Sequence, residues 1–275
     1  MKRIIMGHSP DADDAFMFYG FAKGLVALEG YVIEQRLEDI ESLNRRALRG
    51  EYEVTAISAA LYPKVADTYQ IMRTGVSMGR GYGPRLLVRE PQPLETLKEG
   101  LIAVPGEYTT AYLVLRLLLD DFRPAFVDFL DIPRVVREGE VAAGLVIHES
   151  QLTYEAEGLH LLVDLGRWWQ EETGLPLPLG VDVVRRDLPE DLRLHIRKAW
   201  QESIRAAYAH EEDALDYALQ FGRGLDRETG RRFVRMYVNE DTIDMGEEGE
   251  RALKELFTRA HAQGLIRRVP PVDLI

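Results

Sequence analysis

Cysteine is absent from this chain of 275 residues, which excludes disulfide bonds and thiolate metal sites. Long apolar runs are absent as well, and none approaches the ~20 residues that a membrane-spanning helix needs. The first residues, 1–14, lack the apolar segment of roughly 7–15 residues that a secretory signal peptide contains. We therefore expect a soluble, cytoplasmic protein that does not interact with a membrane.

Basic residues are too few and too scattered to form a nucleic-acid surface. The chain has 34 Lys and Arg against 46 Asp and Glu, a formal net charge of −12, and acids interrupt its arginine-rich stretches. A nucleic-acid-binding domain usually carries a basic patch or stripe, so we expect no nucleic-acid partner. Asparagine is scarce too, with only Asn44 and Asn239, whereas Glu and Arg are abundant. This bias is typical of proteins from thermophiles.

Apolar residues make up 46% of the chain, which is enough to build one large domain or two small ones. Short apolar runs alternate with helical patterns through the first two thirds of the sequence, and this alternation predicts an α/β fold. Strands are expected at 3–6, 31–37, 52–57, 70–73, 85–90, 101–104, 125–130, 141–147, 159–165 and 181–185. The rest of the chain is predicted to be helical, at 190–210, 212–221, 226–238 and 246–263, with a polar turn at 237–245.

Prolines mark two places where the chain is expected to cross between lobes. Pro91 and Pro93 break one predicted strand, and Pro176 and Pro178 interrupt an apolar stretch. Because proline has no backbone N–H, it is disfavoured in helix interiors and in central strands. We therefore predict a discontinuous first lobe of residues 1–90 and 179–275, with a second lobe of residues 91–178 inserted in it.

His148 is the main candidate for a catalytic residue. It directly follows the apolar, β-branched run 141–147, so we expect it at the carboxyl end of a buried strand. Open α/β sheets bind their ligands at such strand ends, and histidine is the side chain that titrates nearest neutral pH. A helix-capping or loop histidine is the alternative. His8 is the other histidine at a predicted strand end.

The strand that ends at Ser58 repeats the local pattern of the strand that ends at His148. A Gly-Glu pair, at 50–51 and again at 139–140, lies between a predicted helix and each strand. This pseudo-repeat predicts that Ser58 and His148 lie on facing edges of two similar halves. The alternative for Ser58 is an N-cap of the helix that follows it.

Thr109 and Thr110 stand between a glycine turn and a strongly apolar helix expected at 111–119. A helix start offers free backbone N–H groups and the positive end of the helix dipole, and the hydroxyl groups add donors. We predict that Thr109, Thr110 and the amides that follow hold a carboxylate of the substrate. A plain N-cap is the alternative, and it needs only one of the two threonines.

Asp11, Asp13 and Asp14 lie between the first predicted strand and an apolar helix expected at 15–28. Carboxylates just before a helix are good caps and favour its dipole, so capping is expected for at least one of them. The group could also bind sugar hydroxyls or a divalent cation, but no second ligand cluster accompanies it. We predict that Asp14 caps the helix or binds substrate hydroxyls, and that no metal is bound.

Four runs of the sequence resemble the 1,4-dihydroxy-6-naphthoate synthase family over nearly the whole chain. They are GRGYGPRLLV at 79–88, AVPGEYTTAY at 103–112, AGLVIHES at 143–150 and VDLGRWWQEETGLPLPLG at 163–180. The resemblance implies a lyase that converts cyclic dehypoxanthinyl futalosine to 1,4-dihydroxy-6-naphthoate in the futalosine route to menaquinone. It also implies a small-molecule carboxylate substrate and a reaction without metal or organic cofactor. The two α/β lobes then correspond to a periplasmic-binding-protein-like type II fold, with the second lobe inserted in the first.

The resemblance also implies roles for particular residues. His148 matches the family's catalytic base, and Thr110 and Ala111 match substrate contacts in its Thr-Thr-Ala motif. The family's other binding loop is matched by Ala56, Ile57 and Ser58.

The N-terminal loop departs from the family pattern. The family usually reads Ser-Pro-Cys-Pro-Asn-Asp-Thr-Phe, whereas this chain reads Ser-Pro-Asp-Ala-Asp-Asp-Ala-Phe at 9–16. Of the polar core only Asp14 is kept. The departure indicates a divergent branch of the family, and it leaves open the exact substrate and the roles of Asp11 and Asp13.

Two other functions fit the same fold. A chorismate dehydratase of the same pathway is one, and the Thr-Thr-Ala and Ile-His-Glu motifs argue against it. A cytoplasmic binding protein for a small carboxylate is the other, because it would share the fold but not the chemistry. The missing signal peptide argues against a solute-binding protein. The sequence does not determine the oligomeric state.

Overall fold

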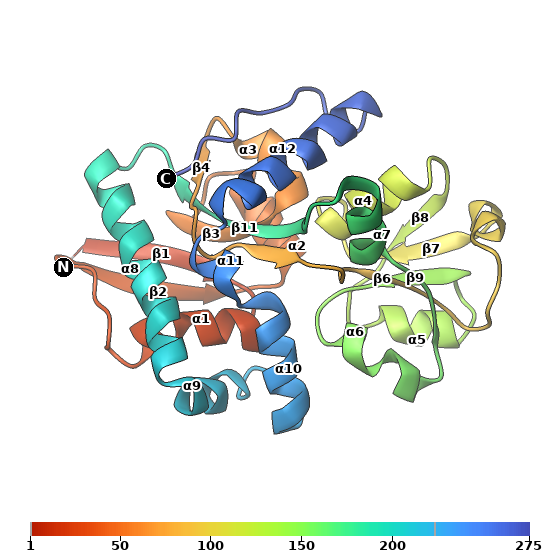
Figure 1. Ribbon diagram of the computed structural model, residues 1–275, viewed down its shortest axis with the longest axis horizontal. Helices are drawn as coiled ribbons and strands as arrows, with labels where there is room; N and C mark the ends of the chain where they lie inside the picture. Colours follow the sequence, from red (N-terminus) through yellow and green to blue (C-terminus); the bar gives the residue numbers. More distant parts are fainter. Residues whose placement is uncertain (1, 223) are drawn as a thin grey trace.

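The computed structural model describes residues 2–222 and 224–275, and it is built around two β-sheets that lie side by side (Figure 1). Helices pack on both sheets, so the fold is α/β, as the alternation of apolar runs predicts. We call the first sheet with its helices the first lobe, and the second sheet with its helices the second lobe.

The first sheet contains strands from distant parts of the chain. They are β1 (Lys2–His8), β2 (Tyr31–Leu37), β3 (Val54–Ser58), β4 (Tyr69–Ile71), β5 (Ser77–Gly79) and β11 (Leu177–Arg185). Their order is β2-β1-β3-β11-β4, and β5 pairs with the first part of β11. Because β1 is parallel to β3, the loop after β1 and the end of β3 lie at the same edge of the sheet. β11 is antiparallel to β3 and begins at that edge.

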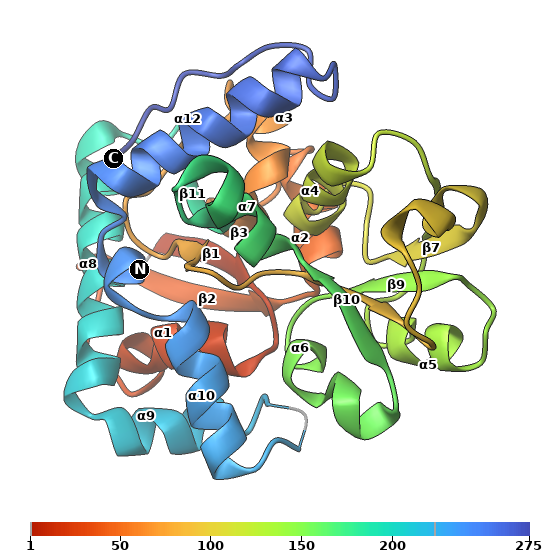
Figure 2. The same ribbon diagram turned by 45° about the vertical axis from the view of Figure 1, so that its right-hand side comes forward.

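The helices of the first lobe cover both faces of its sheet. They are α1 (Ala12–Ala22), α2 (Ile40–Ala47), α3 (Tyr62–Val65), α8 (Glu190–Ala209), α9 (Glu211–Ala218), α10 (Arg227–Tyr237), α11 (Glu240–Ile243) and α12 (Gly246–Ala262), with a 3₁₀ helix, η1 (Ala59–Leu61), before α3. Figures 1 and 2 show α1, α9 and α10 on one side of the sheet and α12 on the other. Among the described residues, no helix combines the length and the apolar character that crossing a membrane requires.

Helix α1 is apolar around most of its circumference, because it packs against the sheet on one side and against α8, α9 and α10 on the others. Gly20 allows a close approach between α1 and α8, since a Cβ at this position would come within 2.6 Å of the Ser203 Cα. This packing fixes the start of α1, and with it the aspartate loop, at the edge of the sheet.

The second sheet is formed by the middle of the chain. Its strands are β6 (Arg85–Val88), β7 (Leu101–Val104), β8 (Arg123–Phe126), β9 (Ala143–Val146) and β10 (His160–Asp164), in the order β10-β6-β9-β7-β8. Its helices are α4 (Thr110–Leu118), α5 (Ile132–Arg137), α6 (Ser150–Thr153) and α7 (Leu165–Thr173), with 3₁₀ helices η2 (Leu94–Glu99) and η3 (Tyr154–Glu157). β9 is parallel to β7, so the residues after both strands lie at one edge.

The chain passes from the first sheet to the second between β5 and β6, and it returns between α7 and β11. Strand β6 pairs with β9 and β10, whereas the division expected at residue 91 assigns this strand to the first lobe. The sheet membership of β6 therefore places the first crossing earlier, between Gly79 and Arg85. The division into two lobes that close on each other stays a prediction.

The expectation that the prolines at 176 and 178 exclude a central strand is wrong for Pro178. Strand β11 begins at Leu177 and lies between β3 on one side and β4 and β5 on the other. The pairing with β5 shifts register between Pro178 and Gly180. Proline lacks the N–H that a regular ladder uses, and an irregularity of this kind is where a strand tolerates it.

Most local predictions agree with the structure. Strands β2 and β7 have the predicted bounds. Asp39 caps α2 by accepting a hydrogen bond of 3.0 Å from the Ser42 amide. Strand β8 begins and ends earlier than predicted, and the polar turn after α10 contains the short helix α11.

The predicted Gly-Glu repeat is present in three dimensions. Gly50 and Gly139 both adopt positive φ, 66° and 75°, within three residues of the ends of α2 and α5. The following amides, of Glu51 and Glu140, donate back to carbonyl groups five residues earlier, at 3.3 and 3.0 Å. Both helices thus end in a Schellman motif, which needs a glycine in the left-handed region. Each motif is followed by a strand, β3 or β9, whose carboxyl end lies at the candidate site.

Candidate active site

One pocket is lined by strand ends and helix starts from both lobes. It receives the start of α1 and the end of β3 from the first lobe, and the start of α4 and the turn after β9 from the second. All the residues predicted to form the site line this pocket: Asp14, Ala56, Ile57, Ser58, Thr109, Thr110, Ala111 and His148. The structure brings them together, while the role of each stays a prediction.

His148 sits in the turn that follows β9. Its φ of 56° makes it the one non-glycine among the described residues in the left-handed region, a conformation that costs roughly 1–3 kcal/mol and recurs at functional sites. The turn directs its ring toward the first lobe, where Nδ1 lies 2.9 Å from Asp11 Oδ2. The ring also packs against Phe129, with 4.9 Å between ring centroids, and its side chain is 16% exposed.

Asp11 occupies the N-cap position of α1 but does not cap the helix. Its buried carboxylate, 2% exposed, instead contacts His148 of the second lobe. Asp14, the third residue of the helix, accepts a hydrogen bond of 2.6 Å at its Oδ2 from the Ser9 amide. Ser9 lies in the loop before the helix, so this bond holds the loop to α1 and does not cap a helix amide, contrary to the capping expectation. Local spacing alone could not distinguish these two aspartates.

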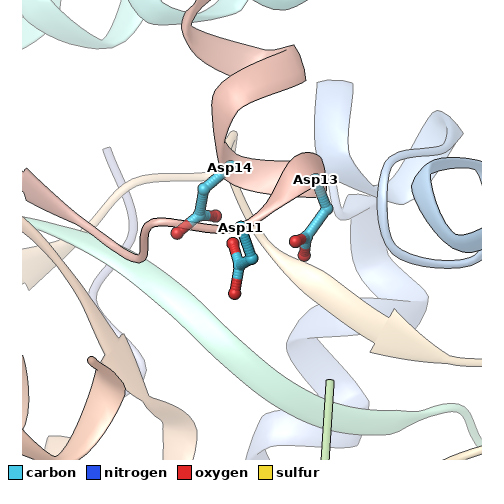
Figure 3. Close-up of side chains that lie close together, drawn as sticks. All are labelled: Asp11, Asp13 and Asp14. Atoms are coloured by element: carbon cyan, nitrogen blue, oxygen red, sulfur yellow. The ribbon is translucent and has the colours of Figure 1, made fainter. Parts of the chain in front are cut away.

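The carboxyl groups of Asp11, Asp13 and Asp14 gather at the start of α1, with Asp11 between the other two (Figure 3). Burial raises the pKa of Asp13 well above its usual value, and the negative charges of Asp11 and Asp14 and a hydrogen bond to Asp11 add to the rise. These effects favour the protonated form of Asp13. Burial also raises the pKa of Asp14, against the opposing effects of His8 and of the Ser9 amide.

These three aspartates are also the one group among the described residues whose ligand atoms, within 4.8 Å of one another, could hold a metal ion. Carboxylate oxygens suit hard cations such as Mg²⁺. Hydrogen bonds account for part of the same group, since Asp14 accepts from the Ser9 amide and Asp11 contacts His148. A cluster of acids does not by itself establish a cation site, so the prediction of a metal-free site stays a prediction.

The two threonines at the start of α4 do not use their hydroxyl groups as expected. Thr109 Oγ1 donates to the Gly106 carbonyl at 2.9 Å and accepts from the Tyr112 amide at 3.2 Å, which is ordinary N-capping. Thr110 Oγ1 donates to the Leu179 carbonyl at 2.7 Å and accepts from the Ala60 amide at 3.1 Å. Because a hydroxyl group has one hydrogen, neither side chain can donate a further bond to a ligand.

Donors for an anion nevertheless remain at this end of the pocket. Within the described chain, the amides of Thr110 and Ala111 have no hydrogen-bond partner, as is usual in the first turn of a helix. Ser58 Oγ accepts from Asn44 Nδ2 at 3.0 Å, which leaves the Ser58 hydroxyl hydrogen for a ligand. Backbone amides at a helix start and a hydroxyl group form a neutral site that suits a carboxylate.

Two further polar residues, Asp182 and Tyr237, line the pocket although they were not predicted to belong to the site. Asp182 interrupts the apolar strand β11, a local signal that could have identified it, and burial raises its pKa well above the usual value. Tyr237 on α10 accepts a hydrogen bond of 2.5 Å from Gln151 Nε2 on α6, which joins the two lobes, and no pattern in the sequence indicates this contact. Among the described lining residues there is no lysine or arginine.

His8, the other histidine at a strand end, has a different environment. It is buried, stacks on Phe18 at 4.8 Å between ring centroids, and places its ring nitrogens near the Ser9 carbonyl and Gln35 Oε1. It is not among the residues that line the pocket. These contacts tie His8 to the packing of the first lobe.

Comparison with protein families identifies one match over most of the chain. A family model described as menaquinone biosynthesis matches residues 4–262. A Thermus thermophilus protein named 1,4-dihydroxy-6-naphthoate synthase is 45% identical over 271 residues, which cover 98% of each chain. A Streptomyces coelicolor protein of the same name is 38% identical over 272 residues, which cover 97% of this chain and 95% of the relative.

Solved structures show the same fold. A crystal structure of a protein from Archaeoglobus fulgidus is similar with a TM-score of 0.92 and 46% identity, over 96% of this chain and 98% of that one. The alkanesulfonate-binding protein of Xanthomonas axonopodis is similar with a TM-score of 0.75 at 13% identity, over 100% of this chain and 98% of that one. The second likeness concerns the fold alone. The chain has the two-lobe fold of periplasmic binding proteins.

Proposed function

The chain belongs to the menaquinone biosynthesis family, and from this premise we propose that it is a lyase that converts cyclic dehypoxanthinyl futalosine to 1,4-dihydroxy-6-naphthoate. The names of the Thermus and Streptomyces relatives support the reaction. The observation that carries the assignment of the site is the contact between His148 and Asp11 in a pocket that both lobes line.

In this proposal His148 is the general base. The reaction requires removal of a proton next to an activated carbon, so that the sugar-derived ring can open and the carbocycle can become aromatic. Nδ1 of His148 faces Asp11, which leaves Nε2 as the nitrogen that takes the proton. Aromatisation supplies driving force, so we propose no metal or organic cofactor. A positioned base contributes roughly 10²–10⁴-fold to the rate.

The chemistry of the two ends of the pocket orients the substrate. We place the substrate carboxylate at the amides of Thr110 and Ala111 and at the Ser58 hydroxyl group. The sugar-derived hydroxyl groups then face the aspartate end, where Asp13 Oδ1 is buried and has no hydrogen-bond partner among the described residues. The reverse orientation would place a carboxylate against carboxylates. Asp14 completes the aspartate end.

The walls between these ends are apolar. Ala56 and Ile57 of β3 lie on one side, and Ile147 lies beside His148 in the second lobe. A largely apolar pocket with a few polar groups at its ends is the usual form of a small-molecule site, and it suits a flat bicyclic product with one carboxylate.

Turnover of the proposed substrate is the direct test. Purified protein incubated with cyclic dehypoxanthinyl futalosine should produce the naphthoate chromophore, and a parallel incubation with chorismate should produce no dehydration product. Conversion of chorismate instead would identify the protein as a chorismate dehydratase. Calorimetric binding of a small carboxylate without turnover of either compound would favour a binding protein. In either case the proposal is wrong.

We also propose a cytoplasmic location and a thermostable protein. A biosynthetic role supports the location, and the scarcity of asparagine together with a relative from Thermus thermophilus supports the stability. Fractionation of the source cells tests the first. A melting temperature in the range of mesophilic domains, about 45–65 °C, would contradict the second.

A further inference from the structure

The contact between Asp11 and His148 joins residues from opposite lobes. Asp11 lies at the edge of the first sheet, before α1, and His148 lies in the turn after β9 of the second sheet. The carboxylate is buried, and the atoms are 2.9 Å apart, a length typical of a charge-assisted hydrogen bond. In this arrangement Asp11 does not cap its own helix, and His148 has a left-handed backbone conformation.

We propose that Asp11 is a positioning residue that holds the ring of His148 in the orientation needed for proton abstraction, and that the base is complete only when the two lobes are together. The inference rests on the proposed function, because it concerns the base of that reaction. Asp11 touches His148 and not the reacting carbon, so its effect on the reaction passes through the imidazole.

The hydrogen bond has two consequences for the ring. A carboxylate that accepts from Nδ1–H keeps the proton on that nitrogen, so the basic lone pair of the neutral ring is on Nε2. When the substrate C–H bond breaks, the electron pair stays on carbon and the proton goes to Nε2. The ring then carries a positive charge, which the carboxylate stabilises across the same hydrogen bond.

Asp13 supports this arrangement. Burial and the neighbouring negative charges raise the pKa of Asp13 and favour its protonated form, which donates a hydrogen bond to the Asp11 carboxylate. The other titratable groups around this pair are Asp14 at the start of α1, His8 at the end of β1, and Tyr82 and Tyr237 from the first lobe and its crossing. Burial raises the pKa of both tyrosines, so they remain neutral near pH 7.

Replacement of the charge at constant shape is the test. Asp11→Asn should lower kcat by about 10²-fold, within the contribution of a positioned base, and leave KM within about twofold. The acidic limb of the pH profile of kcat/KM should move to lower pH, because the protonated imidazole loses its counter-charge. Asp120→Asn removes a charge from an exposed position and should change none of these quantities. A purely structural role for Asp11 would not move the pH profile.

A spectroscopic measurement tests the same contact without turnover. In protein labelled with ¹⁵N-histidine and free of ligand, the His148 signals, identified by their loss in His148→Asn, should show a protonated Nδ1 in slow exchange with water. In Asp11→Asn this protection should be lost. This measurement still tests the proposal if Asp11→Asn is too unstable for kinetics, because the wild-type spectrum alone shows whether Nδ1 carries the proton.

The outcomes separate the two proposals. If the wild type turns over and Asp11→Asn keeps its kcat and its pH profile, the inference is wrong and the proposed function stands. An unprotonated Nδ1 in the wild type overturns the inference as well. If the wild type does not turn over the substrate, the proposed function fails, and the histidine spectra still decide whether Asp11 positions the ring.

Discussion

Thr110→Val is the substitution that most directly tests how the two lobes hold the substrate. The change replaces a hydroxyl group by a methyl group of similar size, so packing around the start of α4 is retained. It removes two hydrogen bonds that join the second lobe to the first, from the Ala60 amide at 3.1 Å and to the Leu179 carbonyl at 2.7 Å. Thr110 is buried, while Ala60 and Leu179 are half-buried.

The expected magnitude follows from these contacts. A typical intramolecular hydrogen bond contributes about 0.5–1.5 kcal/mol net, so the loss of both costs about 1–3 kcal/mol. The two partners are half-buried, and water can reach them when the lobes separate, so the larger penalty for fully buried, unpaired groups does not apply. If the bonds form only when the lobes close on the ligand, this energy appears as affinity, a loss of roughly 5- to 150-fold.

Two assays distinguish where the energy appears. Calorimetry with 1,4-dihydroxy-6-naphthoate measures the affinity, and thermal unfolding of the ligand-free protein measures the stability. Weaker binding with little change in melting temperature indicates bonds made on closure, and a lower melting temperature with unchanged binding indicates bonds present throughout. Thr110→Ser retains the hydroxyl group and should resemble the wild type. Thr258→Val, which removes a hydrogen bond made by an exposed side chain of α12, should change neither quantity by more than about 0.5 kcal/mol. Unchanged affinity and unchanged stability in Thr110→Val would refute the assignment.

Three further changes test other parts of the site. His148→Asn should lose roughly 10²–10⁴-fold in turnover while it keeps its fold and most of its affinity. If this variant keeps near wild-type turnover and His8→Asn loses it, the base is His8 and the assignment to His148 is wrong. Activity should survive prolonged chelation, because Asp14 is expected to bind a hydroxyl group; loss on chelation with recovery on Mg²⁺ or Zn²⁺ would contradict this. Burial raises the pKa of Asp182 above its usual 3.8, so the folded protein loses stability as the pH rises above that value. Asp182→Asn removes the ionisable group, and its side-chain oxygen can still accept from Trp200. This variant should therefore have a higher melting temperature than the wild type at pH 8 but not below pH 3.8. Equal effects at both pH values would show that Asp182 is ionised in the folded protein.

Local elements, and the residues at their ends, could largely be predicted from the order of residues. Apolar periodicity predicted β2 and β7 with their bounds. The Asp39 cap joins residues only three positions apart, so it too is a local feature. The two Schellman motifs follow from the Gly-Glu pairs, because only glycine adopts the left-handed conformation there without strain. These features depend on contacts within a few residues, and such contacts can be derived from the order of residues alone.

Which of these ends meet, and what each polar group does there, depends on how the chain packs in three dimensions. The three aspartates have similar local positions, yet Asp11 contacts His148, burial raises the pKa of Asp13, and Asp14 accepts from the Ser9 amide, because each has different neighbours in space. The hydroxyl group of Thr110 is engaged by residues of the first lobe, and Pro178 lies in a strand because its neighbour pairs irregularly. Partners distant in the sequence come together only through the order of the strands and the packing of the two lobes. Burial, which raises the pKa values of the acids, is likewise a property of the assembled fold.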